Sequence, residues 1–232
     1  MPRTLALVIP VRGFDDAKSR LSSVLDPAQR RQLAQNCARG VIDRAVDCRR
    51  FVVCDDDEVE AWAKSLGAIP VRVQARGLNA SLTEAMPVIV REFEVDFFVI
   101  AHADLPLPAA LDRLIETLKS PPQINGAING AISGEIFDDC ATNSVGQVLL
   151  VPDRRGDGTN VLGLAASLIG QWTFEYGQGS FAAHRAQADR LGCSPTIIED
   201  SDLGLDLDTA EDLLHPCVSR VLPKLLPDWN PS

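Results

Sequence analysis

Several signatures of well-known protein classes are missing from this sequence. None of the six cysteines belongs to a CxxC pair or lies at metal-ligand spacing from a histidine, so we expect reduced thiols and no structural zinc. The apolar run at residues 5–11 is too short for a signal peptide, and no run approaches the 18 apolar residues of a membrane helix. We therefore expect a soluble, cytoplasmic protein that has no membrane partner.

Two nucleotide-binding motifs are also missing, and basic residues (22 Lys and Arg) are fewer than acidic ones (32 Asp and Glu). There is no GxxxxGK[ST] sequence, which argues against a P-loop NTPase, and no GxGxxG follows the first apolar run. The formal net charge of -10 argues against a nucleic-acid backbone or an anionic membrane as the main partner. A small anionic substrate stays compatible with this charge, because a local group of Lys, Arg and metal can reverse the field.

What the sequence does contain is an alternation of short apolar runs with helical patterns. The chain has 232 residues, of which 46% are hydrophobic, which is enough for one domain with a large core. The alternation predicts an α/β fold with a mainly parallel sheet and helices on both of its faces. Expected strands cover residues 5–11, 51–54, 70–73, 96–101, 147–151, 172–176 and 196–199. Expected helices cover residues 26–46, 58–66, 79–93, 108–119 and 181–191.

Three stretches fall outside this regular pattern. Pro87 lies inside the helix expected at 79–93 and is expected to kink or split it, since proline lacks the backbone donor. Residues 121–146 are rich in Gly, Asn and Ser, and we interpret them as an insertion or irregular excursion, with a short hairpin as one option. We place the domain at 1–214 and treat 215–232, with four prolines, as a tail that is partly disordered or laid along the surface.

The acidic segment 205–214 suggests a cation site. If residues 205–208 form a strand, Asp206 and Asp208 point to the same side while the leucines hold the other side in the core. Two carboxylates in this arrangement can share a hard cation such as Mg²⁺, which leaves room for phosphate oxygens. A structural alternative is that Asp208 or Thr209 caps the following helix, with Glu211 and Asp212 favouring its positive end.

Other polar groups follow predicted strands and would meet at the carboxyl edge of the sheet. Asp104 would add a third carboxylate, while Lys18 and Arg20 would supply cations for a triphosphate. Glycine-rich turns at 156–160 and 177–180 can present backbone N–H groups to anionic oxygens. Each feature has a plainer explanation: a solvated helix face for the two cations, a turn residue for Asp104, and ordinary loops for the glycines.

These parts suit nucleotidyl transfer, in which an anionic oxygen attacks the α-phosphorus of a nucleoside triphosphate and pyrophosphate leaves. The nucleophile is already charged at neutral pH, so no Ser-His or Cys-His pair is required. Positioning and charge neutralisation would carry the rate. Of the three histidines, His184 falls in the helix expected at 181–191, where a structural role is the usual one, and His102 and His215 stay unassigned.

The motifs also carry a family resemblance over nearly the whole chain. They are IPVRGFDDAKSRL (9–21), RGLNASL (76–82), ADLPL (103–107), PDRRGDGTN (152–160), FEYGQGSFAAH (174–184) and LDLDTAEDL (205–213). In this order they resemble the 2-phospho-L-lactate or phosphoenolpyruvate guanylyltransferases of coenzyme F(420) biosynthesis. The resemblance implies a single Rossmann-like domain of the molybdopterin-guanylyltransferase type. It also implies transfer of GMP from GTP to a three-carbon phosphate acid, with release of pyrophosphate.

The resemblance implies a role for each matching residue. Asp104, Asp206 and Asp208 would hold Mg²⁺, and Lys18, with Arg20 nearby, would contact phosphates. The nucleotide side would also include Arg12, where the family usually has Lys, and Asn79, for which an N-cap is the plainer alternative. The acid substrate would meet a third set of residues: Thr159, Gly177 and Ser180.

The sequence leaves some choices open. It does not distinguish phosphoenolpyruvate from phospholactate or 3-phosphoglycerate, and a sugar phosphate or another nucleotide also fits the fold. A non-catalytic protein that binds GTP is the alternative from another class. The oligomeric state is not readable from the sequence, so a homodimer stays open.

Overall fold

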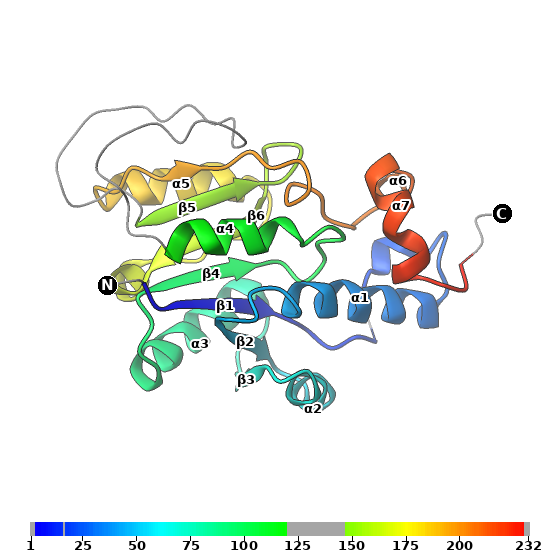
Figure 1. Ribbon diagram of the computed structural model, residues 1–232, viewed down its shortest axis with the longest axis horizontal. Helices are drawn as coiled ribbons and strands as arrows, with labels where there is room; N and C mark the ends of the chain where they lie inside the picture. Colours follow the sequence, from blue (N-terminus) through cyan, green and yellow to red (C-terminus); the bar gives the residue numbers. More distant parts are fainter. Residues whose placement is uncertain (1–2, 16, 120–146, 230–232) are drawn as a thin grey trace.

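The protein is built on a seven-stranded sheet, shown in the computed structural model of Figure 1, which describes residues 3–15, 17–119 and 147–229. The strands are β1 (Leu5–Pro10), β2 (Arg49–Cys54), β3 (Ile69–Arg72), β4 (Phe97–Ala101), β5 (Val148–Pro152), β6 (Thr159–Ala165) and β7 (Thr196–Ile197). Their order across the sheet is β3-β2-β1-β4-β6-β5-β7. Strand β6 runs antiparallel to β4 and β5, and the other pairings are parallel, which confirms the mainly parallel α/β sheet.

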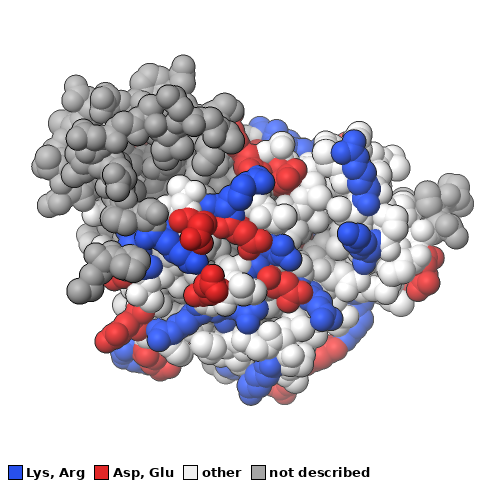
Figure 2. Space-filling view, in the orientation of Figure 1, with Lys and Arg blue, Asp and Glu red and all other residues white. Residues whose placement is uncertain are grey.

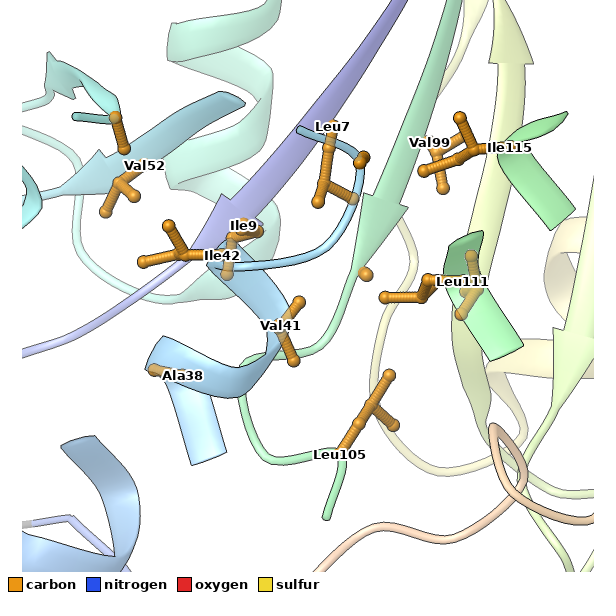
Figure 3. Close-up of a cluster of buried hydrophobic side chains, with 14 of the residues drawn as sticks. Leu7, Ile9, Ala38, Val41, Ile42, Val52, Val99, Leu105, Leu111 and Ile115 are labelled. Atoms are coloured by element: carbon orange, nitrogen blue, oxygen red, sulfur yellow. The ribbon is translucent and has the colours of Figure 1, made fainter. Parts of the chain in front are cut away.

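Helices cover both faces of the sheet, as expected. They are α1 (Pro27–Ile42), α2 (Asp57–Ser65), α3 (Leu78–Glu92), α4 (Ala110–Lys119), α5 (Ser180–Arg190), α6 (Ala210–Leu213) and α7 (Pro216–Leu225), with 3-10 turns η1 (Ser19–Leu21) and η2 (Ala166–Gln171). Helices α1, α2 and α4 pack on one face, where Leu7 and Ile9 of β1 meet Val41 of α1 and Leu111 of α4 (Figure 3). Helices α3 and α5, with η2, pack on the other face.

The helix starts follow from local chemistry. Asp26 caps α1 through a reciprocal capping box with Gln29, and Pro27 takes the first helical position, where its missing N–H costs nothing. Helix α1 ends at Ile42, four residues earlier than expected. Helix α3 continues through Pro87 to Glu92, so the proline does not split it.

One expectation about the second half of the sheet is wrong, and one strand was not expected. The expected strand at 172–176 is irregular, although Trp172 and Phe174 are buried and their neighbours Thr173 and Glu175 are exposed. This alternation, which suggested a strand, arises because one side of the segment packs on the core. The segment is nevertheless not part of the sheet, because the backbone N–H groups of Glu175 and Tyr176 donate to side chains and not to a neighbouring strand. The strand that pairs with β4 is β6, which the sequence analysis did not identify.

The C-terminal segment was expected to be partly disordered or laid along the surface, and its described part packs on the domain. Residues 216–225 form α7, whose Val218 and Leu222 are buried against Leu33 of α1 and Leu213 of α6 in a third apolar cluster. The tail is therefore mostly ordered and helical, although the boundary placed at residue 214 stays a prediction. In Figure 1, α6 and α7 lie at the end of the sheet toward which the β1 and β4 arrows point. None of the described helices is long and apolar enough to cross a membrane. The excursion expected at 121–146 lies outside the described residues.

Candidate active site

The centre of the candidate site is the ammonium group of Lys18, which gathers three acceptors from distant parts of the chain. Its Nζ lies 2.8 Å from Oδ2 of Asp104 and 3.5 Å from Oδ1 of Asp208, and it also donates to the carbonyl of Leu207. Asp104 follows β4, and Lys18 lies in the loop after β1, so the carboxyl ends of two adjacent parallel strands supply the pair. The predicted meeting of Lys18, Asp104 and Asp208 at one edge of the sheet is confirmed.

Charge and backbone geometry both indicate that Lys18 is held firmly. Its side chain is only 8% exposed, and its backbone is left-handed (φ 56°), which is uncommon for a residue other than glycine. Burial alone would lower the pKa of Lys18, but Asp104 and then Asp208 outweigh burial and raise this pKa above its usual value. Burial would likewise raise the pKa of Asp104, but Lys18 and His102 outweigh it and the pKa is lowered. Both groups are therefore charged at neutral pH.

The acidic segment is extended but is not a strand of the sheet. Leu205 and Leu207 are buried while Asp206 and Asp208 are partly exposed, so the expected alternation holds. The segment is joined to the β4 side by the Leu207 N–H, which donates to the carbonyl of Asp104 at 3.3 Å. Burial raises the pKa of Asp206 to about 6, and the charges of Asp104 and Asp208 add to this effect. Asp206 is thus within electrostatic reach of the other two carboxylates.

The cations beyond Lys18 lie further out. Arg20 donates from Nη1 to Oδ2 of Asp208 at 3.0 Å, and its side chain is 73% exposed, which leaves most of the guanidinium in solvent. Arg12 is exposed in the loop after β1. Figure 2 shows basic and acidic side chains next to one another across the described part of one face of the molecule. Positive charge at the site therefore comes from a few individual residues, such as Lys18 and Arg20, and not from an overall basic surface.

The three residues expected to receive the acid substrate come together at the start of α5. The backbone N–H of Thr159 donates to Oγ of Ser180 at 3.0 Å, and the Ser180 N–H donates to the carbonyl of Gly177 at 3.1 Å. Thr159 and Ser180 are buried. Thr159 begins β6, which is antiparallel and therefore starts at the same edge at which β4 ends. The glycine-rich turn predicted at 156–160 instead occupies residues 153–158, because Thr159 and Asn160 already belong to β6; it follows β5 to this edge.

His184 completes this polar group from one turn inside α5. Its Nε2 accepts the backbone N–H of Glu175 at 3.2 Å, which leaves the proton on Nδ1, 3.1 Å from Oγ1 of Thr159. Burial lowers the pKa of His184 to about 4, so the ring is neutral at pH 7. Because Nδ1–H donates to Thr159, the hydroxyl hydrogen of Thr159 is free to donate elsewhere. The hydrogen bond from His184 to Thr159 thus serves a structural role and also connects His184 to a residue that was expected to bind the substrate.

Asn79 bridges two segments of the chain and is not the N-cap that was considered as the plainer alternative. Its Nδ2 donates to the carbonyl of Tyr176 at 3.0 Å, and its Oδ1 accepts the Tyr176 N–H at 2.7 Å. The side chain thus joins the first turn of α3 to the segment that precedes α5. It does not cap α3, which begins after Gly77, a residue with positive φ. One amide hydrogen and one lone pair of Asn79 stay available for another partner.

Two residues that the sequence analysis left out of the site connect its halves. The rings of His102 and Tyr176 lie 5.2 Å apart, and Tyr176 also contacts His184, with ring centres 4.9 Å apart. Within the described part of the chain, Nε2 of His102, the hydroxyl of Tyr176 and Oδ1 of Asp104 are buried without a hydrogen-bond partner. Such atoms are rare in folded proteins and indicate places where a ligand or water can bind. Two signals were available in the sequence: His102 lies two residues before Asp104, and Tyr176 directly precedes Gly177 in the motif at 174–184.

The described residues include no ready-made group of three or more His, Cys, Asp or Glu side chains that could hold a metal ion. At present the ammonium of Lys18 lies between the carboxylates of Asp104 and Asp208. A cation at this place would therefore depend on ligands from a bound substrate in addition to protein carboxylates.

Solved structures define the fold as that of a nucleotidyltransferase. A protein from Desulfovibrio desulfuricans assigned as a nucleotide-diphospho-sugar transferase matches with a TM-score of 0.67 and 13% identity, covering 97% of each chain. A nucleotidyl transferase from Methanothermobacter thermautotrophicus matches with a TM-score of 0.58 and 15% identity, covering 95% of this chain and 99% of the other. At these identities the likeness concerns the fold alone.

Sequence comparison gives the family. A family model described as "Guanylyl transferase CofC like" matches residues 5–126, and the chain belongs to this family. A phosphoenolpyruvate guanylyltransferase of Rubrobacter xylanophilus is 34% identical over 89% of this chain and 90% of its own length. A 2-phospho-L-lactate guanylyltransferase of Methanothermobacter thermautotrophicus is 31% identical over 89% and 81%. A 3-phospho-D-glycerate guanylyltransferase of Phenylobacterium zucineum is 28% identical over 96% and 97%.

Proposed function

We propose that this protein transfers GMP from GTP to a three-carbon phosphate acid, phosphoenolpyruvate or 2-phospho-L-lactate, and releases pyrophosphate, as a step of coenzyme F(420) biosynthesis. The observation that carries the proposal is the contact of Lys18 with both Asp104 and Asp208. Ligands of α/β folds bind at the carboxyl edge of the sheet, and a buried cation held there would meet the phosphates of a nucleotide. Membership of the guanylyl transferase family supports GTP as that nucleotide.

The residues present fit a hard divalent cation such as Mg²⁺. Asp104 keeps one buried oxygen, Oδ1, without a partner, and Asp206 and Asp208 lie within electrostatic reach of it. Mg²⁺ is usually held by one or two carboxylates together with phosphate oxygens and waters, so a complete protein cage is not required. Asp104, with Asp206 and Asp208, would hold the ion. When bound, it would neutralise phosphate charge and orient the oxygens for in-line attack.

The protein's own groups carry the rest of the reaction. Lys18 and Arg20 place positive charge where the leaving pyrophosphate develops negative charge, and Arg12 and Asn79 would line the nucleotide. Lys18 is already desolvated, so its interaction with a phosphate is stronger than that of a solvent-exposed lysine. No general base is required, because the attacking phosphate oxygen is ionised at neutral pH.

The acceptor would lie at the start of α5. The hydroxyl oxygen of Thr159 accepts a hydrogen bond from His184, so the hydroxyl hydrogen of Thr159 can be donated to a ligand. The hydroxyl oxygen of Ser180 accepts the Thr159 N–H, so the hydroxyl hydrogen of Ser180 can also be donated. Two such donors, together with backbone at Gly177, suit a carboxylate or phosphate. His102 and Tyr176 lie between this group and Asp104, so acceptor and nucleotide would meet near these rings.

A direct test incubates the purified protein with GTP, Mg²⁺ and an equal mixture of phosphoenolpyruvate, 2-phospho-L-lactate and 3-phosphoglycerate, and identifies products by mass spectrometry. We expect a guanylyl adduct of one of the first two acids and an equal amount of pyrophosphate. The 3-phosphoglycerate adduct would instead support the second candidate function, which the relative from Phenylobacterium zucineum favours. Parallel reactions with ATP, CTP and UTP, and with sugar phosphates, test the remaining alternatives. GTP binding with no pyrophosphate from any acceptor would identify a non-catalytic binding protein.

A further inference from the structure

Asp212, the third residue of the four-residue helix α6, has an unusually complete set of hydrogen bonds. Its Oδ2 accepts the N–H of Asp208 at 3.0 Å, the N–H of Thr209 at 2.7 Å and the hydroxyl of Thr209 at 2.9 Å. Its Oδ1 accepts from the guanidinium of Arg154. The side chain of Asp212 is only 4% exposed, so both carboxylate oxygens are satisfied by protein groups.

Arg154 approaches this carboxylate from a different part of the chain, the turn between β5 and β6. Its backbone N–H donates to the carbonyl of Gly204 at 2.7 Å, so main chain and side chain hold both ends of the segment that carries Asp206 and Asp208. The backbone packs closely at Gly204, where an added Cβ would lie 3.0 Å from the carbonyl oxygen of Asp200 and in van der Waals contact, at 3.5 Å, with the Arg154 nitrogen. Arg154 of the β5–β6 turn thus holds the acidic segment through hydrogen bonds to Gly204 and Asp212.

The same turn is fastened to the acceptor side. The Gly179 N–H donates to Oδ2 of Asp157 at 3.1 Å, and the Phe181 N–H donates to the Asp157 carbonyl at 3.0 Å. Oδ1 of Asp153 accepts the N–H groups of Arg155 and Asp157, which keeps the turn closed. One turn therefore contacts both the segment that ends in Asp208 and the residues on either side of Ser180.

We propose that Arg154 is a positioning residue: through Asp212 it fixes the backbone at Asp208, and so sets the distance between the cation-binding carboxylates and the acceptor residues. The inference rests on the proposed function and names residues of that same site. Groups that orient metal ligands typically change metal affinity or activity by about 10- to 100-fold when they are removed. Arg154 has no direct contact with Lys18, Asp104 or the proposed acceptor residues among the described interactions, so its effect would pass through Asp212.

The test compares Arg154→Met with Arg155→Met as the matched control. Arg155 is exposed in the same turn, and its substitution removes the same charge. Binding of Mn²⁺ in the presence of GTP, followed by electron paramagnetic resonance, reports the cation site without turnover. Hydrogen exchange at the Asp208 and Thr209 amides reports the hydrogen bonds to Asp212. We expect Arg154→Met to weaken Mn²⁺ binding about tenfold and to speed exchange at both amides at least tenfold. Arg155→Met should stay within twofold of wild type on both measures.

A double-mutant cycle and a conservative variant separate positioning from general loss of stability. If Arg154 acts through Asp212, Arg154→Met combined with Asp212→Asn should be no worse than Asp212→Asn alone. Arg154→Lys keeps the charge and should recover part of the Mn²⁺ affinity. Additive effects, unchanged Mn²⁺ affinity, or unchanged exchange at Thr209 in a folded Arg154→Met would each overturn the proposal. Absence of pyrophosphate release from the wild type would count against the proposed function only, since these readouts do not use turnover.

Discussion

Protonation of His184 offers a quantitative test of the polar group at the start of α5. In the folded protein Nε2 of His184 accepts the Glu175 N–H, and its Nδ1–H donates to Thr159. A second proton would bind at Nε2, where the new N–H would face the N–H of Glu175. The pKa of His184 is about 4 in the fold, compared with 6.5 for the free side chain. Below pH 6.5 the unfolded chain therefore binds a proton that the folded chain does not bind, and stability falls as the pH decreases.

The size of this effect follows from linkage. The two pKa values predict a loss of about 2 kcal/mol of unfolding free energy between pH 8 and pH 5 from this residue, approaching about 3 kcal/mol near pH 4. Other carboxylates titrate over the same range, so the comparison is between wild type and His184→Gln, which keeps a polar side chain but does not titrate. The variant will be less stable than wild type at pH 8. Between pH 8 and pH 5, however, its unfolding free energy should fall by about 2 kcal/mol less than that of wild type.

Urea unfolding followed by circular dichroism at pH 8, 7, 6 and 5 gives the free energies for both proteins. Equal pH dependence in wild type and His184→Gln would refute the reasoning, because it would mean that the ring titrates alike in the folded and unfolded chains. NMR titration of the His184 ring supplies an independent value. A folded-state pKa near 6.5 would contradict the proposed tautomer and the free Thr159 hydroxyl hydrogen that depends on it.

Two further predictions use matched pairs of variants. Lys18→Met leaves the Asp104 carboxylate without its buried partner and should lower the unfolding free energy by about 3 kcal/mol. Arg20→Met breaks an exposed pair and should lower it by less than about 1 kcal/mol. Similar shifts of the urea midpoint in the two variants would contradict the assigned burial. Gly163→Ala in β6 places a Cβ 2.8 Å from that of Leu149, so we expect about 1–3 kcal/mol of destabilisation in thermal unfolding. Gly170→Ala meets nothing within 4 Å and should be nearly neutral; an equal loss in both would count against the packing described for β6.

The fold could be predicted from the sequence where burial on both faces leaves a continuous apolar run. Strands β1 and β4 are of this kind, and every residue of β4 is buried. Strand β6 was missed because its polar start, Thr159 and Asn160, resembles the glycine-rich turn before it. Asn160 is nevertheless buried and donates to the Leu203 carbonyl, a partner 43 residues away that local patterns do not reveal.

The candidate site shows the same division between local and long-range information. Lys18, Asp104 and Asp208 could be found because each follows a predicted strand or lies in an acidic motif, and parallel strands bring such positions to one edge. The partners that orient them could not be found in this way. Asp212 appeared to be an ordinary acidic residue in the first turn of a helix, and its contact with Arg154 joins positions 58 residues apart. Asn79 was expected at the nucleotide, and its hydrogen bonds to the backbone of Tyr176, 97 residues away, were likewise not readable from local patterns.

The proposed function requires that distant carboxylates and Lys18 form one centre for nucleotidyl transfer. The most direct measurement is pyrophosphate release from GTP, Mg²⁺ and the preferred acceptor by wild type, Asp208→Asn and Glu211→Gln, with circular dichroism to confirm folding. Glu211 is an exposed acidic residue three positions further along the chain and serves as the control. We predict that Asp208→Asn abolishes release while Glu211→Gln keeps wild-type rates. Full activity in a folded Asp208→Asn protein would contradict the account.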